Sequence, residues 1–231
     1  MQIVVTEHPL SIEMCQAIHE GTGWPLVPPG PNLPKIATYG ILRGTGECIK
    51  EAEEFWYVDH GYFRHGNGGP HYRVVHNSLW HPHVDASRDW DRFNQLGIRL
   101  KKWNQGKYVI VVPPTIHMER FWNLNGWLDR TISHLKNFTD RPIYIHRKTT
   151  KEPLKNVLQD AWCLVTDHSN AAVDALIAGV PAIITHPDRK LGDLCNIENP
   201  PKDRSFLSRL AHEQWNMDEI RRGEPWSSYL E

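Results

Sequence analysis

The chain has 231 residues, of which 40% are hydrophobic and 23% are charged, and its formal net charge at pH 7 is −1. This balance excludes a disordered or collagen-like chain, and no apolar run approaches the roughly 18 residues of a membrane span. The part before Gly106 carries 10 basic and 11 acidic residues, and the remainder carries 16 of each. Neither part is therefore a nucleic-acid-binding domain that is basic by composition.

The beginning of the chain and its cysteines predict the compartment. Residues 1–7 lack a basic segment followed by a long apolar stretch, so we expect no secretory signal there. The four cysteines lie far apart without a C-x-x-C pair and are expected to be reduced thiols. We therefore expect a cytoplasmic protein that does not insert into a membrane.

The first half of the chain predicts strands that alternate with helices. The expected strands are 2–6, 36–42 and 55–59, and the expected helices are 11–18 and 46–54. The stretch from His60 to His83 is rich in glycine and histidine. We expect a functional loop there, because long connections in compact domains usually carry function.

The second half predicts the same alternation more regularly. The expected strands are 107–112, 143–145, 163–166 and 182–185, and the expected helices are 119–137, 153–159 and 169–178. Residues 203–230 predict two or three further helices. Such alternation favours parallel pairing in a doubly wound sheet. We therefore predict an α/β fold of two small domains, 1–105 and 106–231, joined near Trp103 to Lys107.

The most informative segment runs from Thr166 to Pro181, where a strand ends, small polar residues start a helix, and glycine ends it. Free N–H groups at a helix start favour anions, and Ser169 and Asn170 can add side-chain donors. Asp174, one turn further, can accept hydrogen bonds from ribose hydroxyls. The alternative is that Ser169 only caps the helix and Asp174 is solvated.

Residues 174–181, Asp-Ala-Leu-Ile-Ala-Gly-Val-Pro, resemble the donor-binding helix of GT-B glycosyltransferases, which usually carry Glu at the position of Asp174. The preceding residues 166–170, which include His168, resemble the diphosphate-contacting turn of capsule and lipopolysaccharide sugar transferases. The resemblance implies two Rossmann-like domains facing across a cleft. It also implies that the second domain binds a nucleotide-sugar through His168, Ser169, Asn170 and Asp174.

The tail supports the same family. Residues 193–201, 210–215 and 218–223 resemble the ends of small phage-associated GT-B-like proteins. This resemblance implies C-terminal helices that brace the first domain, with Trp215 as a packing anchor rather than a site residue.

The strand 143–145 is followed by His146, Arg147 and Lys148. In the GT-B family the matching strand end often carries a cation that neutralises the donor diphosphate, whose negative charge grows as it leaves. Arg147 is the first candidate for binding the donor diphosphate, and Lys148 is the second. A solvated basic strand end is the alternative, and it applies more readily to Lys148.

The first half is expected to supply the catalytic base. Asp59 and His60 stand where a strand gives way to a glycine turn, and strand ends of this kind face the ligand crevice in open α/β folds. An inverting transfer needs a general base beside the acceptor hydroxyl. Asp59 is the first candidate and His60 the second; the alternative for Asp59 is a carboxylate that caps the turn.

The loop from Arg64 to Asn77 combines basic side chains, rings and glycines, a mixture that suits phosphates and stacked rings. We expect Arg64, His65, His71 and Arg73 to contact the acceptor. The loop lacks the G-K-[ST] ending of a P-loop. His81 and His83 lack the further ligands of a zinc site, so we expect no metal.

These observations predict a metal-independent glycosyltransferase that uses a nucleotide-sugar as co-substrate and needs no cofactor. The phage-associated resemblance implies hydroxymethylated pyrimidine in DNA as the acceptor and the host cytoplasm as the location. Two alternatives remain: transfer to a cell-surface glycan or a small molecule, and a catalytically silent nucleotide-binding module. Oligomeric state and stereochemistry stay open.

Overall fold

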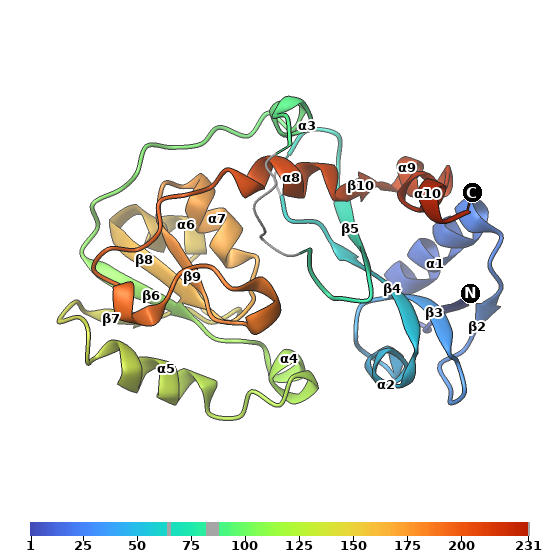
Figure 1. Cartoon of the computed structure of the whole chain (residues 1–231), viewed down its shortest axis with the longest axis horizontal. Coiled ribbons are helices and arrows are strands. Elements are labelled where there is room, and N and C mark those ends of the chain that lie inside the picture. The colour runs from blue at the N-terminus through green and yellow to red at the C-terminus, as the bar shows by residue number, and fades with distance from the viewer. Residues whose placement is uncertain (64–65, 82–87, 231) are drawn as a thin grey trace. The chain divides into compact units, whose positions relative to one another are not determined.

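The computed structural model describes residues 1–63, 66–81 and 88–230 (Figure 1). By its internal contacts the chain divides into two compact units. The first unit comprises the described residues of 1–81, 88–97 and 208–230, and the second comprises 98–207. Residues 208–230 therefore belong to the first unit, although they follow the second in sequence. Each unit is built on a sheet with helices around it, so the predicted α/β class is confirmed.

The first unit contains a mixed six-stranded sheet in the order β10-β5-β4-β3-β1-β2. Its strands are β1 (Gln2–Val4), β2 (Leu26–Val27), β3 (Lys35–Tyr39), β4 (Glu54–His60), β5 (His71–His76) and β10 (Gln214–Asn216). The pairs β1–β2, β1–β3 and β3–β4 are parallel, whereas β4–β5 and β5–β10 are antiparallel.

Two expectations about this sheet are corrected. The stretch 60–83 is not one long loop, because β5 lies within it and pairs with β4. The tail is not purely helical, because β10 pairs with β5. Alternating Tyr72 and Val74 reach the buried core, and this supplies the apolar contacts that a strand needs.

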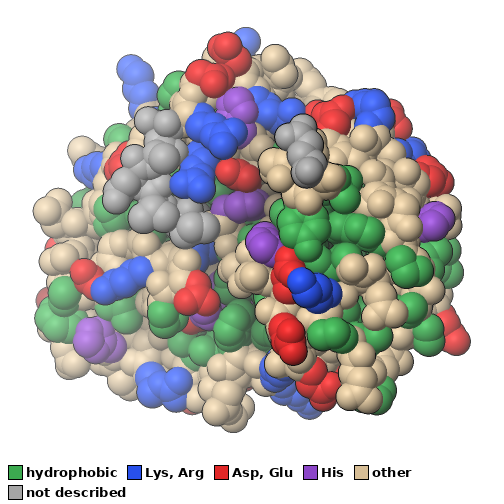
Figure 2. All heavy atoms as spheres, turned by 45° about the vertical axis from the view of Figure 1, so that its right-hand side comes forward, with side chains coloured by type: hydrophobic (Ala, Val, Ile, Leu, Met, Phe, Trp, Pro, Cys, Tyr) green, Lys and Arg blue, Asp and Glu red, His purple; other side chains and the backbone are tan. Residues whose placement is uncertain are grey.

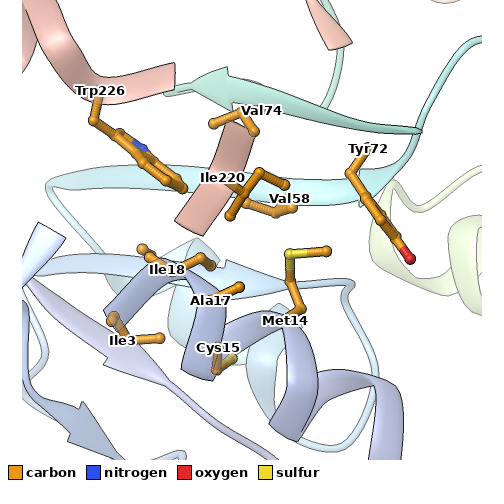
Figure 3. Close-up of a cluster of buried hydrophobic side chains, with 11 residues drawn as sticks. Ile3, Met14, Cys15, Ala17, Ile18, Val58, Tyr72, Val74, Ile220 and Trp226 are labelled. Carbon is orange, nitrogen blue, oxygen red and sulfur yellow. The ribbon is translucent and has the colours of Figure 1, made fainter. Parts of the chain in front are cut away.

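The helices of the first unit are α1 (Pro9–Thr22), α2 (Thr45–Glu51), α3 (Asp91–Gln95), α9 (Met217–Arg221) and α10 (Ser227–Leu230), with α8 (Phe206–His212) leading into its last segment. Figure 3 shows Ile18 of α1, Val58 of β4, Ile220 of α9 and Trp226 converging on one buried cluster. All four side chains are fully buried. The C-terminal segment is thus part of the core of the first unit.

Close backbone approach fastens α9 against α1. A Cβ atom at Gly21 would overlap the carbonyl oxygen of Ile220, and one at Gly223 would overlap the carbonyl oxygen of Gly21. Gly223 also has a φ of 75°, a value that favours glycine. The two glycines therefore permit a contact that side chains would prevent.

The second unit contains a four-stranded sheet in the order β7-β6-β8-β9, with every pair parallel. Its strands are β6 (Tyr108–Val112), β7 (Ile143–Ile145), β8 (Ala161–Thr166) and β9 (Ala182–Ile184). Val109, Val111, Cys163 and Val165 are fully buried. Nearly continuous apolar strands of this kind are typical of a parallel sheet covered on both faces.

The helices of the second unit are α4 (Ile116–Phe121), α5 (Trp127–Leu135), α6 (Leu154–Val157) and α7 (Ala171–Ile177). The single helix expected over 119–137 is instead α4 and α5. Asn123 and Gly126 between them have φ values of 53° and 70°, which interrupt a right-handed helix.

Two further observations concern the molecule as a whole. On the face that Figure 2 shows, Lys and Arg side chains are interspersed with Asp and Glu side chains, in keeping with the near-zero net charge. Within the described residues, no helix is both long enough and apolar enough to cross a membrane.

Candidate functional site

The parallel sheet of the second unit brings four strand ends to one side. Residues that follow parallel strands lie at the same edge of the sheet, which is where open α/β folds bind ligands. We call this the carboxyl edge. It comprises the residues directly after β6, β7, β8 and β9, namely Pro113–Thr115, His146–Lys148, Asp167–Asn170 and Thr185–His186.

A buried Asp–His pair lies at the centre of the carboxyl edge. Oδ2 of Asp167 is 2.7 Å from Nδ1 of His168, and the two side chains are 4% and 7% exposed. Oδ1 of Asp167 accepts a hydrogen bond from the Thr185 hydroxyl at 3.3 Å, and that hydroxyl accepts one from the Trp127 indole at 3.0 Å. The carboxylate is thus satisfied on both oxygens, and it orients the His168 ring.

His186 and Arg189 extend this cluster, and sequence reasoning missed both. Burial lowers the pKa of His186, which favours the neutral form of its ring. Nδ1 of His186 accepts from the N–H of Asp188 at 3.3 Å. Arg189 is buried and donates to the His168 carbonyl at 2.9 Å. The signal for His186 was available, because it follows an expected strand directly.

The start of α7 differs from the expected anion site. The N–H of Ser169 donates to the Thr166 hydroxyl at 3.4 Å, and the N–H of Ala171 donates to the Ser169 hydroxyl at 3.2 Å. The next three N–H groups donate to the carbonyls of Ser169 and Asn170. Since these donors are already used, a phosphate at this turn would depend on side chains. The Ser169 hydroxyl thus accepts from the first N–H of α7, although the N-cap residue is Asn170, whose side chain makes no capping hydrogen bond.

The side chains of the remaining residues expected to bind the donor are partly or fully exposed to solvent. Asn170 is half-buried and its side-chain oxygen lies 3.4 Å from Nη1 of Arg189. Asp174 is half-buried in the first turn of α7. Arg147 and Lys148 are exposed, and neither forms an ion pair with a residue that the structure describes. The two cations are therefore available to an anion.

In the first unit, Asp59 holds a buried arginine. Oδ2 of Asp59 accepts from Nη2 of Arg73 at 2.9 Å and from the Tyr57 hydroxyl at 2.8 Å, while Oδ1 accepts from the His60 N–H. Arg73 is 4% exposed and also donates to the carbonyls of His60 and Leu79. Arg73 is therefore not a surface group for an acceptor phosphate, which corrects the role expected of it.

His60 lies at the surface beside two tyrosines. Its Nε2 is 3.3 Å from the Tyr39 hydroxyl, and its ring stacks on Tyr72 with centroids 6.1 Å apart. Burial, followed by the charge of Asp59, raises the pKa of Tyr39 well above its usual value. Tyr39 therefore stays protonated and can donate to His60. Sequence reasoning missed Tyr39, because the expected strand ran on to residue 42, whereas β3 ends at Tyr39.

The other residues expected to contact the acceptor give little support to an acceptor-binding site in this segment. Nδ1 of half-buried His71 lies 3.1 Å from the Gly69 carbonyl, and burial lowers the pKa of this ring. Arg64 and His65 lie outside the described residues, as does His83. His81 contacts Glu213 at 3.2 Å. In the part of the chain that is described, no three His, Cys, Asp or Glu residues gather in a way that could hold a metal ion.

Comparisons with known proteins add little to this geometry. No family model matches the chain, and no curated protein matches it. Among solved structures, the chain is similar to Thermosulfurimonas dismutans KpsC, a beta Kdo 2,4 transferase. The identity is 12%, the TM-score is 0.48, and the match covers 92% of this chain and 90% of KpsC. A similarity at this level assigns neither a substrate nor a residue role to the present chain.

Proposed function

We propose that this protein is a glycosyltransferase that binds a nucleotide-sugar at the carboxyl edge of the second unit. One observation carries the proposal: residues that the sequence motifs nominate separately, His168 to Asn170 and Arg147 with Lys148, follow strands that end at the same edge. The resemblance of residues 166–181 to a donor-binding segment supports the same site.

Each group at this edge has a role in the proposal. Arg147 and Lys148 neutralise the diphosphate, since negative charge grows on the leaving group during transfer. Asp174 accepts hydrogen bonds from the ribose. Asp167 is buried and hydrogen-bonded to both His168 and Thr185, and these bonds keep the turn before α7 in one conformation. None of these roles requires a metal ion.

On the acceptor side, we propose His60 as the general base in place of Asp59. Both carboxylate oxygens of Asp59 already accept hydrogen bonds, and losing its charge would leave Arg73 unpaired. His60 is exposed and has the Tyr39 hydroxyl beside it. A base must lie within hydrogen-bond reach of the acceptor hydroxyl, and an exposed ring meets this condition more easily than a paired carboxylate.

The acceptor that we propose first is hydroxymethylated pyrimidine in DNA, on the sequence resemblance alone. Arg73 is not among the groups that would bind this DNA, because its side chain is buried and forms an ion pair with Asp59. A cell-surface glycan is the second candidate.

The test combines binding with transfer. Thermal shifts with a panel of nucleotides and nucleotide-sugars come first, because a ligand at ~100 times its Kd stabilises a protein by about 2.7 kcal/mol. Mass measurement of hydroxymethylated DNA, plain DNA and glycan acceptors, each incubated with the donor pool, then detects transfer. Binding without transfer to any acceptor would favour the silent module. The absence of binding by every nucleotide would reject both readings.

A matched pair of variants ties binding to the carboxyl edge. Arg147→Ala is expected to weaken nucleotide binding by roughly tenfold or more, as a charge-assisted hydrogen bond is lost. Lys136→Ala is the control, because Lys136 is an exposed cation at the end of α5, which leads back to the opposite edge of the sheet. Equal binding by the two variants would exclude Arg147 from the site.

A further inference from the structure

His146 is a buried side chain at the carboxyl edge with an unused nitrogen. It directly follows β7, and its N–H donates to the Val111 carbonyl at 3.0 Å, which extends the pairing with β6 by one residue. The side chain is 8% exposed. Among the residues that the structure describes, nothing hydrogen-bonds to its Nδ1.

The other two histidines of this edge differ from His146 in this respect. Nδ1 of His168 pairs with Asp167 at 2.7 Å, and Nδ1 of His186 accepts from the N–H of Asp188 at 3.3 Å. Buried polar atoms are rarely left without a partner, because desolvation is then uncompensated. The exceptions often mark a place that a ligand fills.

Burial lowers the pKa of His146, which favours the neutral form of its ring at pH 7. A neutral imidazole can donate from one nitrogen and accept at the other, and nothing described fixes which role Nδ1 takes. It therefore suits an uncharged polar atom better than a phosphate. The charged groups of this strand end, Arg147 and Lys148, come next in the chain and are exposed.

We propose that His146 hydrogen-bonds an uncharged polar atom of the nucleoside, a ribose hydroxyl or a base heteroatom, while Arg147 and Lys148 contact the phosphates. The inference rests on the proposed function, since it assumes a nucleotide at the carboxyl edge. In this proposal, one strand end has two parts: His146 recognises the nucleoside, and Arg147 and Lys148 bind the negative charge of the phosphates. When a nucleotide is bound, it supplies the hydrogen-bond partner for Nδ1 of His146 that the described residues do not supply.

The experiment compares His146→Phe with His134→Phe. Phenylalanine keeps a ring of similar size and removes the hydrogen bond. His134 is exposed in the last turn of α5, which leads back to the opposite edge of the sheet, and serves as the control. Titration calorimetry with nucleoside mono- and diphosphates, and with inorganic diphosphate, gives the affinities. For His146→Phe we expect roughly five- to tenfold weaker nucleotide binding and unchanged diphosphate binding, the loss of one neutral hydrogen bond.

A second measurement protects the test against a folding defect in the variant. In wild-type protein labelled with ¹⁵N-histidine, the Nδ1 resonance of His146 is expected to shift when a nucleotide is added and to stay in place with inorganic diphosphate. If wild-type protein binds nucleotides but neither His146→Phe affinity nor this resonance changes, the role of His146 is wrong and the proposed function stands. If wild-type protein binds no nucleotide, both are wrong.

Discussion

The same dipeptide, Asp-His, lies at the end of β4 in the first unit and directly after β8 in the second, and the two copies are held in different ways. Asp59 at the end of β4 pairs with a buried arginine and leaves His60 at the surface. Asp167 after β8 pairs with its own neighbour, and both side chains are buried.

The neighbouring strands explain the difference. β5 runs antiparallel to β4 and places Arg73 directly opposite Asp59. β8 lies between two parallel strands, whose residues opposite its end are Val112 and Ile184. No cation comes from them, so Asp167 pairs with the adjacent imidazole. In this chain, the partner of each carboxylate therefore depends on the residues that the neighbouring strands place beside the strand end.

The largest effect is expected from the exposed histidine of the first copy. His60→Ala should lower kcat by roughly 10²–10⁴-fold, the usual contribution of a general base, with little change in stability. Single-turnover measurements with saturating nucleotide-sugar and the identified acceptor test this. A large loss of turnover in folded Asp59→Asn, with His60→Ala nearly normal, would return the role of base to Asp59.

The second prediction concerns the paired carboxylate of the first copy. Asp59→Ala should lower the free energy of unfolding by about 3 kcal/mol, because it leaves the buried guanidinium of Arg73 unpaired. Hydrogen exchange over the peptides of the first unit measures the effect. Asp218→Ala removes the exposed Arg221–Asp218 pair of the same unit and is expected to cost far less. Equal costs would mean that Asp59 is only a solvated carboxylate.

The third prediction concerns the second copy. Asp167→Asn keeps the shape of the side chain but removes its charge, and should lower the free energy of opening of the second unit by about 2 kcal/mol. Hydrogen exchange over residues 98–207 measures it, and exchange in the first unit should stay unchanged. Unaltered protection around β8 and β9 would show that the pair with His168 contributes little.

The fourth and smallest effect is expected at the opposite end of β4. Its first residue, Glu54, lies beside Lys35, Tyr229 and His76, which together lower its pKa from 4.5 to about 2. Because the pKa of the folded state is the lower one, this stabilisation is complete above pH 4.5 and is lost as the pH falls toward 2. Glu54→Gln should therefore be less stable than wild type at pH 7 and equal to it near pH 2. A difference that stays constant over this range would exclude an electrostatic cause.

The sequence predicted elements well where a single run of residues decides them. Val109, Val111 and Val165 lie in apolar runs that read as buried parallel strands, and the structure confirms those strands. The sequence-based prediction failed where a strand forms only by pairing with residues that are distant in the chain. The residues of β5 look like a polar loop until β4 and β10 pair with them on either side.

The site shows the same division. The strand ends that carry Asp167 and His168 follow from local pattern, and so does the position of Arg147. The pairing of Asp59 with Arg73 depends on strand direction and register, which composition and spacing do not reveal. The interruption after α4 was foreseeable in principle, because an Asn-Leu-Asn-Gly run is a poor helix.

The inclusion of residues 208–230 in the first unit has a consequence for synthesis on the ribosome. The second unit is complete once residue 207 has emerged, whereas the first unit still lacks Ile220 and Trp226 from its core and β10 from the edge of β5. Until then, the nascent first unit presents an unpaired strand edge and an open apolar cluster, both of which attract other chains. The part of the protein that is translated first is therefore expected to reach its native state last.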